Sequence, residues 1–375
     1  MTDSYKLIDT TLREGEQTPG LNFSLEQKKS IVDHLAQVGV AEVELGIASP
    51  LSHQLAELLA YCAGHHPGLR TSLWARCLDA DIRHAAELGG RVVSLSIPVS
   101  DIHLRHKLER DRAWACRTLA ESIGLAIGLG LEVAVGFEDA TRAEAGFVRE
   151  MARLAEEAGA VRIRLADTVG VASPGSLSRL VEQVGEVTIR AELGVHTHND
   201  FGLACGNAVA ALEAGANWAD GALLGLGERA GCAPLEQLVA YLVILRGEGG
   251  MQLKPLKSLA LYLAAEAGVV IGSREPLLGE AIFSCESGLH LDGLFKEPRT
   301  YEPYPPERIG SKRRLLIGAK SGKAALGHQL ERLGLLEGPA SEARLDGLVE
   351  KVRRAGRDKG RGLTLQELKS LWQLS

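Results

Sequence analysis

The alternation of short apolar segments with longer amphipathic ones constrains the fold of this chain most strongly. In the longer segments apolar residues recur every three or four positions, as in 24–39, 142–159 and 206–215, and each of these three ends at a glycine, a common helix terminator. This rhythm predicts an α/β fold, a (β/α)8 TIM barrel, which typically takes roughly 250 residues. Eight segments have the length and aliphatic composition of β-strands: 5–10, 41–47, 70–76, 91–97, 131–137, 161–167, 192–198 and 218–224.

The doubly wound open sheet is the main alternative, since it also alternates strands with helices. That fold places a glycine-rich phosphate loop after its first strand. Here the first expected strand is followed by TLREGEQTPG (11–20), in which charged residues stand where that loop needs glycines. We therefore expect a TIM-barrel catalytic domain over 1–260. The rhythm breaks after it, and 261–375 is expected to be a mainly helical region that serves as a lid or dimerisation element.

Composition narrows the class of function. The 375 residues carry a net charge of -6, which gives no support for binding to nucleic acid or to an anionic membrane. The sequence shows neither a signal-peptide pattern nor an apolar run long enough to span a bilayer. The six cysteines lack the spacing of a structural zinc site. We expect a cytoplasmic protein that acts on small molecules.

Two histidines stand two residues apart in GVHTHND (194–200), at the end of the seventh expected strand. Side chains alternate along a strand, so His196 and His198 face the same side, at the end of the barrel where active sites lie. Glu14, after the first strand, is expected at the same mouth. Two imidazoles and one carboxylate suit a divalent cation such as Mg²⁺, Mn²⁺ or Zn²⁺. Taken alone, the histidine pair fits a hydrogen-bonded structural pair equally well.

Five motifs, in order along nearly the whole chain, resemble a family of metal-dependent Claisen-condensing enzymes that includes 2-isopropylmalate synthase and homocitrate synthase. Within that family, SLSIPVSDIHLRHKL (94–108) and the lack of a long regulatory domain resemble the nitrogen-fixation type of homocitrate synthase more than the longer leucine-pathway enzymes. The five motifs are LIDTTLREGEQTPG (7–20), RLADTVG (164–170), GVHTHNDFGLA (194–204), GLGERAG (225–231) and CESGLHLDG (285–293).

The resemblance implies condensation of acetyl-CoA with 2-oxoglutarate and water to give homocitrate and CoA. Glu14, His196 and His198 would hold a cation that polarises the keto group. Arg13, which is permanently charged, would donate hydrogen bonds to the oxygen on which negative charge develops.

Further roles follow from the same resemblance. Gln17 and Thr168 would hydrogen-bond the substrate carboxylate, although Thr168 equally suits an N-cap of the helix that follows. Glu138, His290 and Tyr301 would remove a proton from the acetyl methyl group. In the family the last two come from the neighbouring subunit, which implies a homodimer whose C-terminal region reaches the partner's active site. Without the family, His290 is a lone histidine among apolar residues and reads as structural.

Three departures from the family pattern stand out. Cys232 replaces the usual asparagine after GLGERAG, and Cys285 stands where histidine is common. The fifth strand reads VAVGFED (133–139), without the arginine and serine of the lysine-pathway enzymes. Arg76, at the end of the third strand, could replace that cation against the second carboxylate of a 2-oxo diacid, or it could form a surface ion pair.

These departures leave alternatives open. The chain could be a 2-isopropylmalate synthase or a citramalate-type condensing enzyme. Cys232 raises the possibility of a metal-dependent acyl-CoA lyase, since a related lyase family uses a cysteine in a glycine-rich loop. A metal-binding barrel without catalysis is the alternative from another class. The joint presence of an electrophilic centre and a base favours the synthase.

Overall fold

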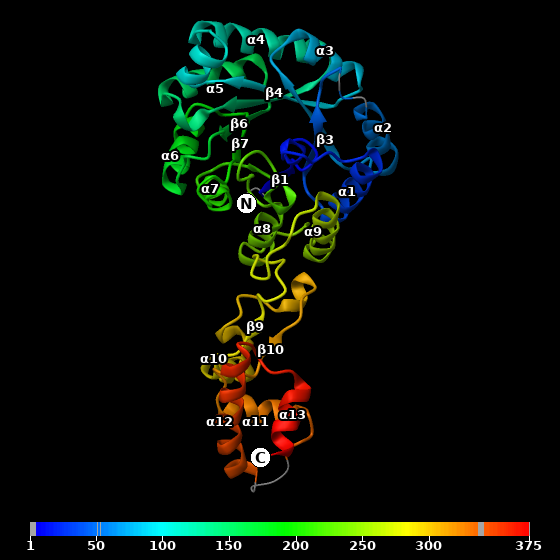
Figure 1. The fold of residues 1–375 in the computed structure, drawn as a ribbon. Helices are drawn as coiled ribbons and strands as arrows, with labels where there is room; N and C mark the ends of the chain where they lie inside the picture. The colour runs from blue at the N-terminus through cyan, green and yellow to red at the C-terminus, as the bar shows by residue number, and fades with distance from the viewer. Residues whose placement is uncertain (1–4, 51, 53, 337–340, 375) are drawn as a thin grey trace. The chain divides into compact units, whose positions relative to one another are not determined.

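The computed structural model describes residues 5–50, 52, 54–336 and 341–374, and the chain divides into two compact units, Met1–Val270 and Ile271–Ser375. In the first unit eight parallel strands close into a barrel, with β1 hydrogen-bonded to both β2 and β8 (Figure 1). The predicted TIM barrel is confirmed. Its strands are β1 (Lys6–Asp9), β2 (Glu42–Ile47), β3 (Arg70–Arg76), β4 (Val92–Pro98), β5 (Glu132–Glu138), β6 (Arg162–Asp167), β7 (Glu192–Thr197) and β8 (Trp218–Gly221).

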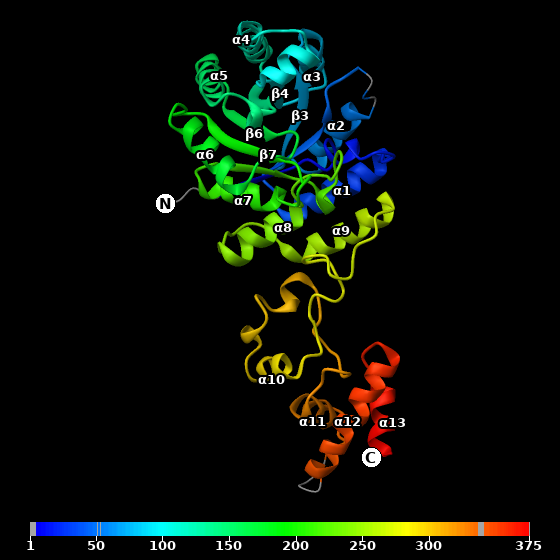
Figure 2. The same ribbon diagram turned by 60° about the vertical axis from the view of Figure 1, so that its left-hand side comes forward.

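Helices surround the barrel, as Figures 1 and 2 show. The last of them, α9, packs against α1 and α8, so the boundary expected at residue 260 falls within a helix of the first unit. The helices are α1 (Leu25–Val38), α2 (Leu55–His65), α3 (Asp79–Glu87), α4 (Arg112–Gly128), α5 (Ala145–Ala158), α6 (Pro174–Gly185), α7 (Ala204–Glu213), α8 (Leu235–Ala240) and α9 (Leu253–Ala267).

Local sequence determines where these helices begin and end. Before α1, the Ser24 side chain accepts a hydrogen bond from the backbone of Gln27, and the Gln27 side chain accepts one from the backbone of Ser24. The helix ends at Gly39, whose φ of 82° is costly for a residue with a Cβ. One face of the helix, including Ile31 and Leu35, is fully buried against the barrel.

The interior of the barrel is charged, whereas TIM barrels usually fill this space with branched aliphatic side chains. At the N-terminal end of the strands, Arg162 of β6 lies 2.7 Å from Glu42 of β2. Arg70 of β3 forms ion pairs with both Glu42 and Glu132. Most residues of the opposite phase, such as Leu95, are apolar and fully buried, although carboxylates such as Asp9 occur at the C-terminal ends of the strands. Oppositely charged side chains therefore pair with one another in the space that aliphatic side chains usually fill.

The second unit has a hydrophobic core of its own, to which Leu291, Leu326 and Leu348 contribute. The helical character expected for this region is confirmed. Among the described residues of the whole chain, no helix combines the length and the apolar character that crossing a membrane requires. The elements of the second unit are β9 (Ser284–Cys285), β10 (Arg314–Leu315), α10 (Gly288–Lys296), α11 (Lys323–Arg332), α12 (Ser341–Lys359) and α13 (Leu365–Gln373).

Candidate active site

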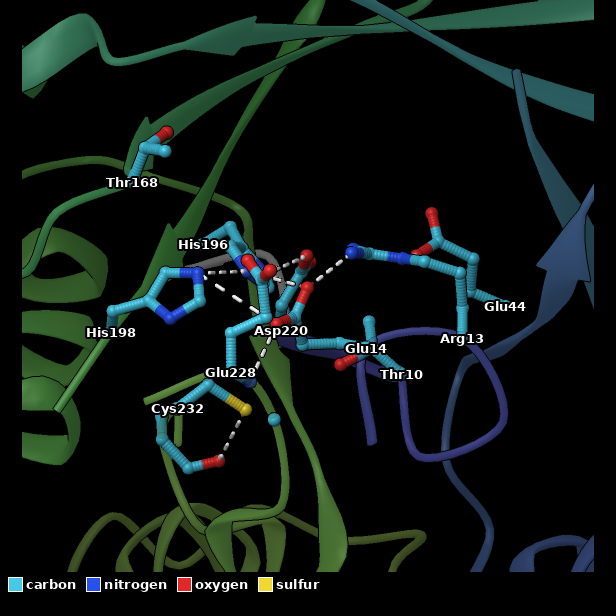
Figure 3. A network of polar contacts seen from close by, with 12 residues as sticks. Thr10, Arg13, Glu14, Glu44, Thr168, His196, His198, Asp220, Glu228 and Cys232 are labelled. Atoms are coloured by element: carbon cyan, nitrogen blue, oxygen red, sulfur yellow. Dashed lines mark hydrogen bonds and ion pairs between the residues drawn. The ribbon is translucent and has the colours of Figure 1, made fainter. Parts of the chain in front are cut away.

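Glu14, His196 and His198 come together at the C-terminal mouth of the barrel, as the sequence predicts. One potential ligand atom of each lies within 4.8 Å of the other two, and all three residues are buried (Figure 3). The Nε2 atoms of the two imidazoles are 3.3 Å apart and lie 3.7 and 3.9 Å from the carboxylate oxygens of Glu14. One carboxylate and two imidazoles that converge in this way fit a divalent cation with open coordination positions.

The charge states of these groups suit a cation. Burial acts to raise the pKa of Glu14, but Arg13 and His196 lower it below its usual value, so the carboxylate is ionised. Burial, helped by the neighbouring His196, lowers the pKa of His198 to about 4. The His198 imidazole is therefore neutral at pH 7 and can bind a cation through a nitrogen lone pair.

The GLGERAG loop holds Glu14 in place. The backbone N–H of Glu228 donates to Glu14 Oε1 over 3.3 Å. A Cβ on Gly227 would lie 3.1 Å from the same oxygen, a close contact, and the φ of 154° at this position also favours glycine. The loop is tied to the second histidine as well, since the residues His198 and Cys232 form an isolated β-bridge.

Arg13 lies beside Glu14 in the mouth of the barrel, and its predicted role toward an oxyanion stays a prediction. Its Nη1 forms an ion pair with Glu14, and its Nε donates to Glu44 Oε2 over 2.5 Å. The hydrogen bonds that Arg13 makes within the described part of the chain involve Nε and Nη1. Burial acts to lower the pKa of Arg13, but Glu44 and Glu14 raise it, so the side chain stays charged.

Two buried carboxylates behind this site were not predicted from the sequence. Glu44 of β2 accepts from Arg13, and Asp220 of β8 lies with its Oδ2 2.9 Å from His196 Nδ1 (Figure 3). Partners of this kind orient a metal ligand and fix its tautomer. For Glu44 the signal was present in the sequence, because EVELG (42–46) places charged residues at alternate positions of a strand that is buried on both faces.

Glu138, the last residue of β5, belongs to a second polar cluster. Lys107 Nζ donates to Glu138 Oε1 over 2.5 Å, and His103 Nδ1 lies 2.8 Å from the same oxygen without hydrogen-bond alignment. His103 also lies near Asp139, at 3.7 Å. His103 and Lys107 lie in the segment that carries the finer resemblance, but neither was predicted as a site residue.

The structure corrects one interpretation of Thr168. It is not a helix cap, because α6 begins at Pro174 and its N-cap is Ser173, which is followed by a proline suited to the first helical position. The Thr168 hydroxyl instead accepts a hydrogen bond of 2.8 Å from the backbone of Asp139. This contact places Thr168 beside the Glu138 cluster.

Gln17 and Arg76 lie on the rim of the barrel mouth. Gln17 is exposed and lines a cavity of about 400 Å³ together with Arg13. Arg76 forms an ion pair with Asp81, with 2.7 Å between Nε and Oδ2, and its side chain is 60% exposed. Arg76 thus forms the surface ion pair that was one of its two predicted roles. Its other predicted role, binding a substrate carboxylate, stays a prediction.

His290 and Tyr301 lie in the second unit, where their rings pack with centroids 4.2 Å apart. His290 is exposed, and Tyr301 is 51% exposed. The structure therefore brings these two predicted residues together within their own unit. Their predicted role as an acid–base pair stays a prediction.

The structure places Cys232 behind the metal-binding cluster. Its thiol is buried and donates to the carbonyl oxygen of Leu226 over 3.2 Å. Burial, with the neighbouring charge of Glu14, raises the pKa of Cys232 well above its usual value. This shift is opposite to the one that proton transfer by a lyase-type cysteine requires. Cys285, the other departure from the family pattern, lies in β9 of the second unit.

Sequence comparison defines the class of protein. Residues 4–262 match the HMGL-like family, and residues 277–360 match a domain described as homocitrate synthase post-HMGL domain-like. The first match covers more than half of the chain. The chain therefore belongs to the HMGL-like family, in the branch that contains the homocitrate and 2-isopropylmalate synthases, and the family predicted from the five motifs is confirmed.

Individual relatives agree with this assignment. A homocitrate synthase of Frankia sp. (strain FaC1) is 39% identical over 97% of this chain and 89% of its own length. A 2-isopropylmalate synthase (number 2) of Caldanaerobacter subterraneus is 35% identical over 98% of this chain and 94% of its own length. The crystal structure of HMG-CoA lyase from Bacillus subtilis superposes with a TM-score of 0.65 at 19% identity, covering 72% of this chain and 96% of the lyase, and it supports the barrel fold.

Proposed function

We propose that this protein is a homocitrate synthase, an acyltransferase that condenses acetyl-CoA with 2-oxoglutarate and water to give homocitrate and CoA. The observation that carries the proposal is the convergence of Glu14, His196 and His198 with a charged Arg13 in one buried mouth. A non-catalytic barrel has no need for a guanidinium beside its cation site. The homocitrate synthase-type domain at 277–360 and the Frankia relative support the choice of reaction.

The residues of the mouth have distinct tasks in this reaction. A divalent cation held by Glu14, His196 and His198 would act as a Lewis acid on the keto group. Arg13 Nη2 donates a hydrogen bond to the keto oxygen and stabilises the negative charge that forms there. Gln17 and Thr168 donate to the carboxylate that adjoins the keto carbon.

The acetyl methyl group needs a base, and we assign this task to His290 with Tyr301 and Glu138. Imidazole accepts and returns a proton near neutral pH. The contact between the His290 and Tyr301 rings supports their joint action. The proposal includes a homodimer in which the second unit of one protomer serves the barrel of its partner.

A 2-isopropylmalate synthase is the second candidate function. The observation that favours it is the ion pair between Arg76 and Asp81. Arg76 is the side chain expected to bind the second carboxylate of 2-oxoglutarate, and here it is paired with Asp81 instead. A monocarboxylic 2-oxo acid with an aliphatic chain requires no such cation. The 2-isopropylmalate synthase relative from Caldanaerobacter is consistent with this candidate.

The finer assignment extends to the cellular role. The segment 94–108 and the relative from Frankia support a homocitrate synthase of the nitrogen-fixation type, acting in the cytoplasm.

Release of CoA from acetyl-CoA with a panel of 2-oxo acids tests the proposal. We expect turnover with 2-oxoglutarate, and preference for 2-oxoisovalerate would establish the second candidate instead. In the Arg13→Ala variant we expect turnover to fall by roughly 100-fold or more, because a donor to the developing oxyanion is lost. Its metal content, measured by atomic emission, should match that of the wild type. No CoA release with any acid would refute both enzyme functions.

A further inference from the structure

Arg164 of β6 connects four strands inside the barrel. It is only 4% exposed. Its Nη1 donates to Asp220 Oδ2 of β8 over 2.7 Å and to Glu44 Oε1 of β2 over 3.1 Å. Its Nη2 donates to the hydroxyl of Ser94 on β4 over 2.9 Å. A single guanidinium therefore fixes both of the carboxylates that lie behind the candidate site.

Each of these two carboxylates holds a different residue of the mouth. Glu44 Oε2 accepts from Arg13 Nε over 2.5 Å, while Glu44 Oε1 faces Arg164. Asp220 Oδ2 lies 2.9 Å from His196 Nδ1 and also accepts from Arg164. An oxygen that accepts from a guanidinium is an acceptor toward the imidazole as well, so His196 Nδ1 carries the hydrogen. The Nε2 lone pair of His196 is then directed to the cation site.

The charge balance behind the site depends on Arg164. Burial acts to lower its pKa, but Asp220 and Glu44 raise it, so the guanidinium is always charged. Without it, Asp220 would be a buried carboxylate whose remaining described ion-pair partner is the His196 imidazole. A planar guanidinium can meet two carboxylates and a hydroxyl at fixed angles, whereas a lysine ammonium offers one point of charge on a flexible stem.

We propose that Arg164 is a positioning residue of this enzyme, which through Asp220 and Glu44 holds His196 in its metal-binding tautomer and Arg13 in its oxyanion-binding orientation. Arg164 itself belongs neither to the Glu14, His196 and His198 cluster nor to the groups assigned to the substrate. Its effect on turnover rests on the proposed function, but its effect on the affinity for a metal ion does not.

The Arg164→Lys variant tests this proposal, because it keeps a buried positive charge and loses the geometry of the fork. We expect the Kd for Mn²⁺, measured by equilibrium dialysis on the metal-stripped full chain, to rise about 10- to 100-fold. At saturating Mn²⁺ we expect kcat for CoA release to remain depressed, because Arg13 loses its orientation, while KM for the 2-oxo acid changes little.

Arg162→Lys is the matched control. Arg162 lies two residues away on the same strand, is equally buried, and contacts Glu42 through both Nη atoms at 3.0 and 2.7 Å. Its described contacts do not include Arg13 or His196. We expect Arg162→Lys to lower the Tm but to leave both the Kd for Mn²⁺ and kcat within about twofold of the wild type, since no orienting partner of the site is lost.

Wild-type affinity for Mn²⁺ in Arg164→Lys, or an equal loss of affinity in both variants, would overturn the proposal. If Arg164→Lys does not fold, Asp220→Asn takes its place, with the same rise in Kd expected and an unchanged Kd as the overturning result. A wild-type protein that releases no CoA, yet binds Mn²⁺ in a manner that depends on Arg164, would refute the synthase while supporting the positioning of His196.

Discussion

Cys232 illustrates how a single residue near a site can be tested for a chemical role. Its buried thiol has a raised pKa and donates to a backbone carbonyl, a contact that a serine hydroxyl can also make. We therefore expect Cys232→Ser to retain most of the wild-type turnover in the CoA-release assay. A loss of roughly 100-fold or more, the size expected for removal of an acid–base group, would instead identify the thiol as a proton carrier.

Asp9, at the end of β1, should make the stability depend on pH. Burial raises its pKa from 3.8 to about 7, despite hydrogen bonds from Thr11 that act to lower it. Between these values the folded protein retains a proton that the unfolded chain has lost, so stability falls as the pH rises from about 4 to 7. Asp9→Asn cannot ionise, and its stability relative to the wild type should increase over this range by up to roughly 4 kcal/mol.

Unfolding by denaturant at pH 4, 6 and 8 measures this difference. Asp79→Asn, at an exposed position at the start of α3, controls for the loss of a carboxylate. A stability difference between Asp9→Asn and the wild type that stays constant from pH 4 to 8 would contradict the raised pKa of Asp9.

Among the elements, the loop after β8 contacts the candidate site directly, through the backbone of Glu228 and the Glu14 carboxylate. At Gly231, φ is 81° and a Cβ would lie 1.8 Å from the carbonyl oxygen of Gly225. The same segment is joined to the histidine strand by a hydrogen bond from Asn199 N to Gly231 O. We expect Gly231→Ala to displace the loop, to weaken its contact with Glu14, and to reduce stability by about 1–3 kcal/mol.

Gly20→Ala is the control for this variant. Gly20 has a φ of 83°, but a Cβ there would meet no atom within 4 Å. Its cost should be that of the backbone conformation alone. Thermal unfolding measures the loss of stability, and the Kd for Mn²⁺ measures the weakened contact of the loop with Glu14. Equal Tm and Kd values for Gly231→Ala and Gly20→Ala would show that the close packing of Gly231 is unimportant.

The strands and their order in the barrel could be predicted from the sequence, because short apolar segments and amphipathic helices have different periods. The cluster of candidate metal ligands could be predicted too. His196 and His198 lie at the end of β7, and Glu14 follows β1, which only β8 separates from β7. Glu44, Arg164 and Asp220 were missed because their contacts cross the barrel, and the register between distant strands is set only when the sheet closes. The interpretation of Thr168 as a helix N-cap was wrong for a local reason, because Ser173 and Pro174 form the stronger helix start.

For the whole molecule, the proposed homodimer makes a specific prediction. If His290 of one protomer serves the site that contains Arg13 of its partner, Arg13→Ala and His290→Ala chains are each inactive alone. A mixed dimer then contains one site with both residues intact. Co-expression of the two variants with different affinity tags should restore roughly a quarter of wild-type CoA release, because about half of the dimers are mixed and half of their sites are intact.

Purification through both tags in succession isolates the mixed species, whose activity per dimer should be about half that of the wild type. If His290 acts within its own protomer, the mixed dimer has no intact site, and restoration would be absent. Mass photometry of the purified protein gives the oligomeric state directly.

The charged interior of the barrel has a thermodynamic consequence. Hydration of apolar surface raises the heat capacity when a protein unfolds, whereas hydration of polar surface lowers it. When this barrel unfolds, it exposes charged side chains to water in place of branched aliphatic ones, among them Arg162, Arg164, Glu42 and Glu44. Its stability should therefore vary less steeply with temperature than that of a barrel of the same size with an aliphatic centre.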